Sequence, residues 1–143
     1  MRCSAIIKPA NTTNLILMHI PSHKSIPTPA GHYSPVIGHN GTLYISGQLP
    51  IDPTTKVAPQ SIEEQTITAL NNLENLLLAA GSKRDHVLQV RIYVSNIDHW
   101  DQVNKTYAGW FGEHKPARAI IPCGDLHFGC LLELEATAAI IDS

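Results

Sequence analysis

The stretch Leu131-Leu132-Glu133-Leu134-Glu135-Ala136-Thr137-Ala138 decides the fold class more than any other part of this chain. Side chains along a β-strand alternate between its two faces. One face is therefore predicted to carry Leu132, Leu134, Ala136 and Ala138, and the opposite face Glu133, Glu135 and Thr137. The pattern predicts a final strand, between Cys130 and Ile141, that turns an apolar face to a core and a polar face away from it.

A second strand signal, Pro116-Ala117-Arg118-Ala119-Ile120-Ile121, lies about a dozen residues before the final strand. Arg118 and Ile120 are predicted to point to the same face. A guanidinium stays charged in proteins, so an arginine in a mostly apolar strand needs an anion. If the two strands pair, Arg118 lies near one of the glutamates. It then either forms a structural ion pair, or binds a ligand carboxylate while Glu133 handles a water or a proton.

The region before these strands predicts a β-hairpin. Residues 34–37 and 42–46 flank His39-Asn40-Gly41, a turn signal of the Asn-Gly type. Gly47-Gln48-Leu49-Pro50 is expected to end the second strand of the hairpin. Residues 52–60 hold two prolines among polar residues and are predicted to form a loop.

Two helices and one more strand are predicted in the middle of the chain. Ser61 and Glu64 match a capping box and Gly81 suits a C-terminal cap, so a helix is expected between them. A β-branched strand is predicted over 87–94, and a second helix over about 100–111 with Asp98 as its N-cap.

The predicted order is β-β-α-β-α-β-β, which favours an α+β fold of two layers. One mixed sheet would carry both helices on a single face. The other face of the sheet also has to be covered, and a ring of subunits would cover it.

Length and composition limit the class of protein further. The chain has 143 residues, enough for one domain, and we expect an N-terminal extension over 1–25 followed by a single domain over 26–143. Only 15% of residues are charged, which favours surface hidden in an oligomer. The formal net charge of −2 argues against general nucleic-acid binding, which needs clustered lysine and arginine.

Cysteine usage and the N-terminal region indicate the compartment. Three cysteines without paired spacing predict no disulfide framework and a reducing environment. No acidic residue precedes Asp52, as in transit peptides, but Arg2 is the one arginine there. We therefore expect a cytoplasmic protein rather than a mitochondrial one. No apolar run reaches the length of a membrane-spanning helix, so no membrane partner is expected.

The sequence predicts neither a metal nor a cofactor. His19 and His23 are four residues apart, but Pro21 lies between them and no third ligand completes a site. There is no glycine-rich phosphate loop and no dinucleotide fingerprint. Ser46 precedes a glycine at a strand end but lacks the G-x-S-x-G elbow of a hydrolase nucleophile.

Five short motifs, in this order, resemble the Rid family, also called the YjgF family. They are Gly31-His32-Tyr33-Ser34, Ile45-Ser46-Gly47-Gln48-Leu49-Pro50, Val103-Asn104-Lys105-Thr106-Tyr107, Pro116-Ala117-Arg118 and Leu132-Glu133-Leu134-Glu135-Ala136. The resemblance extends from about Ile26 to Ile141 and is strongest in the last two motifs.

The resemblance implies a chorismate-mutase-like α+β fold and a homotrimer with a sheet-lined central barrel. Three clefts would then lie between neighbouring subunits. Active members of the family hydrolyse enamines and imines, such as 2-aminoacrylate and 2-imino acids, to 2-keto acids and ammonia. No cofactor is implied.

The resemblance also implies roles for individual residues. Arg118 matches the arginine that binds the substrate carboxylate, and Glu133 matches the glutamate that positions or activates the attacking water. The positions that match cleft-lining residues are Tyr33, Ser46, Gly47 and Asn104.

One departure from the family pattern leaves alternatives open. The deaminases commonly have cysteine two residues after the arginine, and this chain has Ile120. If the backbone of that residue serves the substrate, activity is kept and the apolar side chain favours bulkier imino acids. If a thiol is required, the protein either acts on a different substrate or is a non-catalytic trimer that binds small carboxylates or has a regulatory role. Endoribonuclease activity is a third alternative, which the net charge disfavours.

Overall fold

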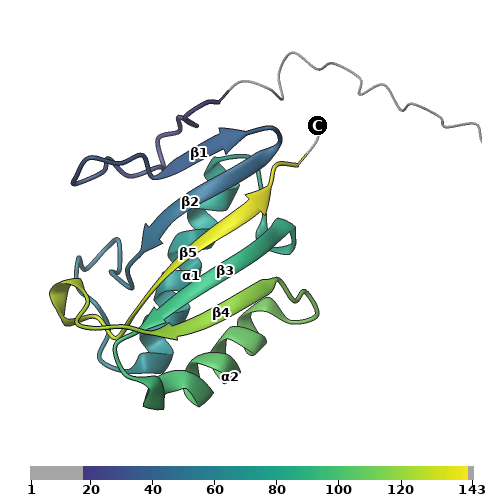
Figure 1. The fold of residues 1–143 in the computed structure, drawn as a ribbon. Helices are drawn as coiled ribbons and strands as arrows, with labels where there is room; N and C mark the ends of the chain where they lie inside the picture. The colour runs from purple at the N-terminus through teal and green to yellow at the C-terminus, as the bar shows by residue number, and fades with distance from the viewer. Residues whose placement is uncertain (1–17, 142–143) are drawn as a thin grey trace, which may run out of the picture.

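The architecture is one five-stranded sheet with two helices, seen in a computed structural model that describes residues 18–141 (Figure 1). Residues 1–17, most of the predicted N-terminal extension, lie outside the described residues. The strands are β1 (Val36–His39), β2 (Thr42–Gln48), β3 (Val87–Val94), β4 (Ala117–Pro122) and β5 (Leu132–Ala139). The helices are α1 (Ile62–Ala79) and α2 (Trp100–Phe111).

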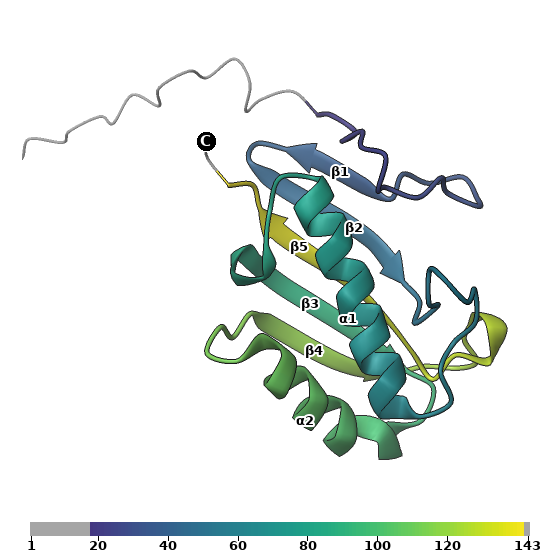
Figure 2. The same cartoon turned by 180° about the vertical axis from the view of Figure 1, so that it is seen from behind.

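The strands lie in the order β1-β2-β5-β3-β4. Strands β3 and β4 run parallel, and the other neighbouring strands are antiparallel. Both helices cover the same face of this mixed sheet, as the two opposite views show (Figures 1 and 2). The predicted α+β arrangement of two layers is confirmed. No helix within residues 18–141 combines the length and the apolar character needed to span a bilayer.

The core lies between the helices and the sheet. Its largest fully buried side chains include Leu70, Leu73 and Leu77 of α1, packed over Ile92 of β3 and Leu134 of β5. The alternation predicted for the final strand is confirmed, because every second residue of β5 from Leu132 to Ala138 is buried. Within residues 18–141, no second layer covers the face of the sheet away from the helices.

Polar side chains cover much of that open face. The Tyr93 hydroxyl donates a hydrogen bond to the Glu135 carboxylate at 2.7 Å, and the Arg91 guanidinium lies 3.9 Å from the same carboxylate. Tyr44 of β2 is half exposed on this face. The face away from the helices therefore carries charged and aromatic side chains that are not covered by another layer of residues 18–141.

Local sequence signals explain the ends of the hairpin and of α1. Asn40 and Gly41 both have positive φ, 50° and 77°, as a tight turn between antiparallel strands requires. The Ser61 hydroxyl accepts the Glu64 amide at 3.1 Å, and Gly81 ends the helix with a φ of 88°. Strand β2 continues to Gln48 through an irregularity in its pairing with β5, two residues beyond its predicted end.

The predicted cap of α2 is wrong. A short 3-10 turn, Ile97–His99, leads into the helix, and the Asn96 side chain accepts the Asp98 amide at 2.9 Å. Residue His99 precedes α2 without a side-chain capping bond. The chain therefore enters the helix through a turn that Asn96 caps, and Asp98 lies inside that turn. The final strand is also shorter than predicted, with a second 3-10 turn at His127–Gly129 before it.

The pairing between the Arg118 strand and the Glu133 strand, which the sequence left open, does not form. Strand β3 lies between them, paired in parallel with β4 and antiparallel with β5. The connection from β3 through α2 crosses over the sheet and returns the chain beside β3 in the same direction, as in other β-α-β units. The only remaining neighbour position on β3 is then taken by β5.

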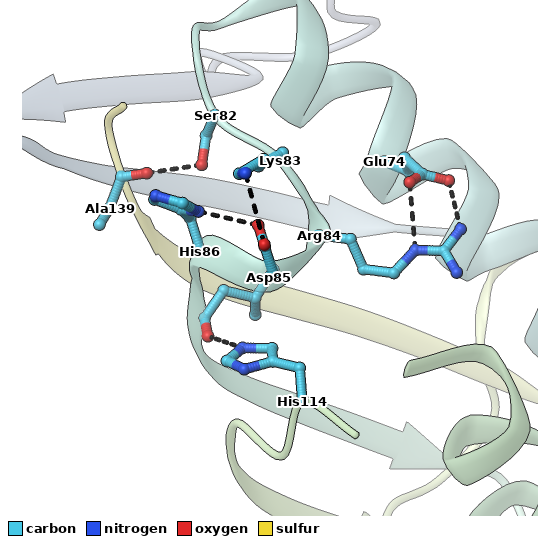
Figure 3. A network of polar contacts seen from close by, with 9 residues as sticks. Glu74, Ser82, Lys83, Arg84, Asp85, His86, His114 and Ala139 are labelled. Atoms are coloured by element: carbon cyan, nitrogen blue, oxygen red, sulfur yellow. Dashed lines mark hydrogen bonds and ion pairs between the residues drawn. The ribbon is translucent and has the colours of Figure 1, made fainter. Parts of the chain in front are cut away.

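A partly exposed arginine, Arg84, ties α1 to α2, and Figure 3 shows its contact with Glu74 of α1. Arg84 donates two hydrogen bonds to the Glu74 carboxylate, at 3.1 and 2.6 Å, and one to the Trp110 carbonyl at 2.6 Å. Its guanidinium carbon lies 3.6 Å from the centre of a Trp110 ring. Nearby, the Ser82 hydroxyl donates to the Ala139 carbonyl, so the turn after α1 is also fastened to β5.

Replacing this arginine should destabilise the fold. We expect Arg84→Ala to lower the free energy of unfolding by about 2 kcal/mol, since hydrogen bonds to charged groups and the stacked ring are lost together. Arg84→Lys should lower the free energy of unfolding by a smaller amount, because lysine keeps the positive charge but lacks the planar guanidinium. Lys83→Ala is the matched control. It removes only an exposed ion pair with Asp85, so we expect a change below about 0.5 kcal/mol. Urea denaturation measures all three, and equal effects for Arg84→Ala and Lys83→Ala would contradict the prediction.

Candidate active site

Arg118 projects from β4 toward α2, on the face of the sheet that the helices cover. Its Nη1 donates to the Asn104 side-chain oxygen at 2.9 Å. Its guanidinium carbon lies 4.9 Å from the ring centre of Tyr107 and 5.9 Å from that of Trp100. Aromatic rings and a neutral amide hold the guanidinium in place but leave its charge uncompensated.

No carboxylate neutralises Arg118 within residues 18–141, where the ion pairs involve other side chains. The structural ion pair with Glu133 that the sequence left open is therefore not formed in the single chain. A guanidinium has five N–H donors, and Asn104 takes one of them. The remaining donors are available to an anion from outside the chain.

A cleft of about 410 Å³ lies beside Arg118, between α2 and the start of β4. Its apolar walls include Tyr107, Ala108, Phe111 and Pro116. Ile120, two residues after Arg118 in β4, is half-buried and packs against the core. A cation beside apolar walls suits a small carboxylate that also has an apolar part.

Glu133 projects from β5 on the open face of the sheet and lies against Gly47 of β2. A Cβ at Gly47 would overlap the Glu133 carboxylate, so the absence of a side chain there makes room for it. Gly47 also lines a second cleft, of about 370 Å³, together with Tyr33. The Ser46 hydroxyl donates to the Ser34 carbonyl at 2.6 Å and so fastens β2 to the segment that carries Tyr33.

The seven predicted site residues thus form two separate groups in one chain. Arg118, Asn104 and Ile120 belong to β4 and α2. The other group, on or near β2 and β5, consists of Glu133, Gly47, Ser46 and Tyr33.

The sheet register shows how far apart the two groups are. Glu133 shares a row with Tyr93 and Ile121, and Arg118 lies three residues before Ile121 in β4. Standard strand dimensions then put the Cα atoms of Arg118 and Glu133 about 14 Å apart. Because Arg118 faces the helices and Glu133 faces away from them, one small substrate cannot contact both within one chain.

The contact of Arg118 with Tyr107 was not predicted, because nothing in the sequence alone shows that this aromatic residue lies beside Arg118. Tyr107 is three residues after Asn104, so both lie on the same side of α2. That spacing was a usable signal once Asn104 had been assigned to the cleft. Trp100, one turn before Asn104, was missed for the same reason.

Two cysteines, Cys123 and Cys130, lie in the described part of the chain. Burial, and secondarily the charge of Glu133, raises the pKa of the Cys130 thiol, which favours its neutral form. The Cys123 thiol lies 3.3 Å from the Gly124 carbonyl, away from the Arg118 cleft residues. Among residues 18–141, no group of three or more His, Cys, Asp and Glu side chains is placed to hold a metal ion.

The chain is similar to known proteins over almost all of its described residues. Residues 23–140 match the family described as Endoribonuclease L-PSP. The chain is 35% identical to Protein HMF1 of Saccharomyces cerevisiae over 81% of its length and 90% of that protein. It is 32% identical to 2-iminobutanoate/2-iminopropanoate deaminase of Rattus norvegicus over 86% of its length and 90% of that enzyme.

The fold is also similar to that of a protein whose structure has been solved. The crystal structure of YyfA from Yersinia pestis, described as a protein of unknown function of the conserved Rid protein family, superposes with a TM-score of 0.81. The two are 36% identical, and the match covers 87% of this chain and all of the other.

Adding a methyl group at Gly47 should displace Glu133 without unfolding the protein. In Gly47→Ala the new Cβ would overlap the Glu133 carboxylate, which is the free end of a flexible side chain and can rotate away. We expect a change in unfolding free energy below about 1 kcal/mol. A crystal structure of the variant should show Glu133 in a new rotamer.

Gly109→Ala is the matched control for this experiment. A Cβ at Gly109 of α2 meets nothing within 4 Å. Glu133 should therefore keep its position in the control. An unmoved Glu133 in Gly47→Ala would contradict the arrangement described here.

Proposed function

Since this chain belongs to the Rid family, also called the YjgF or L-PSP family, we propose that it hydrolyses 2-imino acids and their enamine tautomers to 2-keto acids and ammonia. The observation that carries the proposal is Arg118, an uncompensated guanidinium beside an apolar cleft. The rat relative is named for the deamination of 2-iminobutanoate and 2-iminopropanoate, which are small carboxylates of this kind.

The proposed active unit is a homotrimer in which neighbouring chains complete each other's sites. The Arg118 group of one chain would meet the Glu133 group of the next. A closed ring makes such contacts between unlike surfaces, so every subunit supplies both groups to different clefts. The polar open face of the sheet and the division of the site residues into two groups support this assembly.

The proposed hydrolysis requires the site to bind a carboxylate, hold one water and transfer protons. Arg118 binds the substrate carboxylate through parallel N–H···O bonds, which orients the imine carbon. Glu133 of the neighbouring subunit accepts a proton from a water held about 3 Å from that carbon, and the oxygen adds to the protonated imine. Glu133 returns the proton to nitrogen and then accepts the hydroxyl proton as the C–N bond breaks, so that ammonia leaves as the keto group forms. The proton left on Glu133 passes to the ammonia, which departs as ammonium. Atoms and charge balance without a redox step.

The cleft geometry supports imino acids with bulkier side chains than 2-iminopropanoate has. A volume of about 410 Å³ far exceeds what a methyl group needs, and its walls include two aromatic rings. Ile120 adds an apolar surface on the same face as Arg118. An apolar substrate side chain would replace water along these surfaces, and each buried CH₂ contributes about 0.8 kcal/mol.

Imine decay measures this activity directly. An amino acid oxidase generates each imino acid, and semicarbazide traps what has not been hydrolysed. We expect the protein to accelerate decay, more for a leucine-derived than for an alanine-derived imino acid. Arg118→Ala should abolish the acceleration while the trimer remains intact by size-exclusion chromatography.

Lys105→Ala is the control for loss of a cation. Lys105 is exposed on α2 next to Asn104, and its replacement should leave the rates unchanged. Equal decay with and without wild-type protein would end the proposal. Saturable binding of 2-keto acids without turnover would instead favour the non-catalytic trimer. RNA is not favoured as a substrate, because the net charge is −2.

Mixing two inactive variants tests whether the sites are shared between chains. In trimers formed at random from equal amounts of Arg118→Ala and Glu133→Ala chains, some clefts receive an intact Arg118 and an intact neighbouring Glu133. Counting arrangements around a closed ring gives about one quarter of the wild-type activity. The two variants are unfolded, mixed, refolded and assayed beside each variant refolded alone. No recovery in refolded, trimeric mixtures would show that the two residues do not meet between subunits.

A further inference from the structure

Tyr107 carries a buried polar group that neither the fold nor the proposed reaction uses. Its side chain is 6% exposed in the middle of α2. The hydroxyl has no hydrogen-bond partner among residues 18–141. A buried hydroxyl without a partner destabilises a fold, because it loses its bonds to water and gains none.

Packing alone does not explain why this residue is a tyrosine. Phe111, one turn later in α2, is equally buried, and its ring centre lies 4.6 Å from that of Tyr107. A phenylalanine at position 107 would fill the same space without a lone hydroxyl. Unsatisfied buried polar groups are rare in proteins and often have a functional role.

The position of Tyr107 indicates what that role is. The ring lies beside the guanidinium of Arg118, and both residues line the 410 Å³ cleft. Burial raises the pKa of Tyr107 to about 12, although the charge of Arg118 acts in the opposite direction. The phenol is therefore neutral at physiological pH and keeps its proton to donate.

We propose that Tyr107 is a further substrate-binding residue, whose hydroxyl donates a hydrogen bond to the carboxylate that Arg118 holds. Because the hydroxyl is buried in the ligand-free chain, this bond requires the side chains around it to shift when the carboxylate binds. Asn104 holds Nη1 of Arg118 in place. The ligand carboxylate then accepts hydrogen bonds from both the guanidinium and the Tyr107 hydroxyl. The identity of the ligand rests on the proposed function.

The inference predicts opposite effects of one substitution on stability and on binding. Tyr107→Phe keeps the ring beside Arg118 and removes only the hydroxyl. We expect the melting temperature of the ligand-free protein to rise by about 2–4 °C, because an unsatisfied group has gone. We expect the Kd for 2-ketobutyrate, measured by calorimetry, to weaken about tenfold, because one hydrogen bond to a charged ligand is lost.

Tyr93→Phe is the control for stability. The Tyr93 hydroxyl has a partner, Glu135, so its removal should lower the melting temperature. A lower melting temperature for Tyr107→Phe would show that its hydroxyl has a partner in the assembled protein, and would overturn the inference. An unchanged Kd would overturn it too, as would the absence of saturable binding to the wild-type protein. Turnover is measured separately, so an inactive wild-type protein that binds 2-ketobutyrate would contradict the proposed function and leave this test valid.

Discussion

The two-residue period of side chains along a β-strand governs how this protein can work. It places Arg118 on the helix-covered face of β4 and Glu133 on the open face of β5, with β3 between the two strands. The period cannot be altered locally, because a shift of one residue would also turn the buried leucines of β5 outward. A site that needs both charges therefore cannot be built within one copy of this sheet. The alternation that builds the core is therefore also what separates the two charges.

Two arginines in this structure illustrate how surroundings decide the role of a guanidinium. Arg84 stacks on Trp110 and is neutralised by two hydrogen bonds to Glu74, so its bonding capacity is used within the fold. Arg118 lies beside Tyr107 and is held by the neutral amide of Asn104. Aromatic contact is common to both, and the carboxylate is present only at Arg84. That difference leaves Arg118 with charge and donors to offer a ligand.

The second group of site residues depends on close backbone approach. Gly47 lies where any side chain would meet the Glu133 carboxylate, and the bond from Ser46 to the Ser34 carbonyl fixes the neighbouring segment. These contacts position the Glu133 carboxylate and Tyr33, and the side chain of Tyr33 is about half exposed beside the second cleft. Neither group closes around a small molecule alone, which is consistent with clefts formed between subunits.

The features that depend on neighbouring residues in the chain could be predicted from the sequence alone. The Asn40-Gly41 turn, the Ser61 cap of α1 and the alternation of β5 were all predicted, because their physical causes lie within a few residues. The predicted cap at Asp98 failed because Asn96, two residues earlier, accepts the amide of Asp98 and so caps a 3-10 turn in which Asp98 lies. The partners of each strand were decided only by the tertiary structure. The alternation of side chains determines which face of the sheet each one occupies, but it does not determine which strand lies beside it. The separation of Arg118 from Glu133 therefore depends on the position of β3 between β4 and β5. The contact of Arg118 with Tyr107 likewise depends on the position of α2 over the sheet.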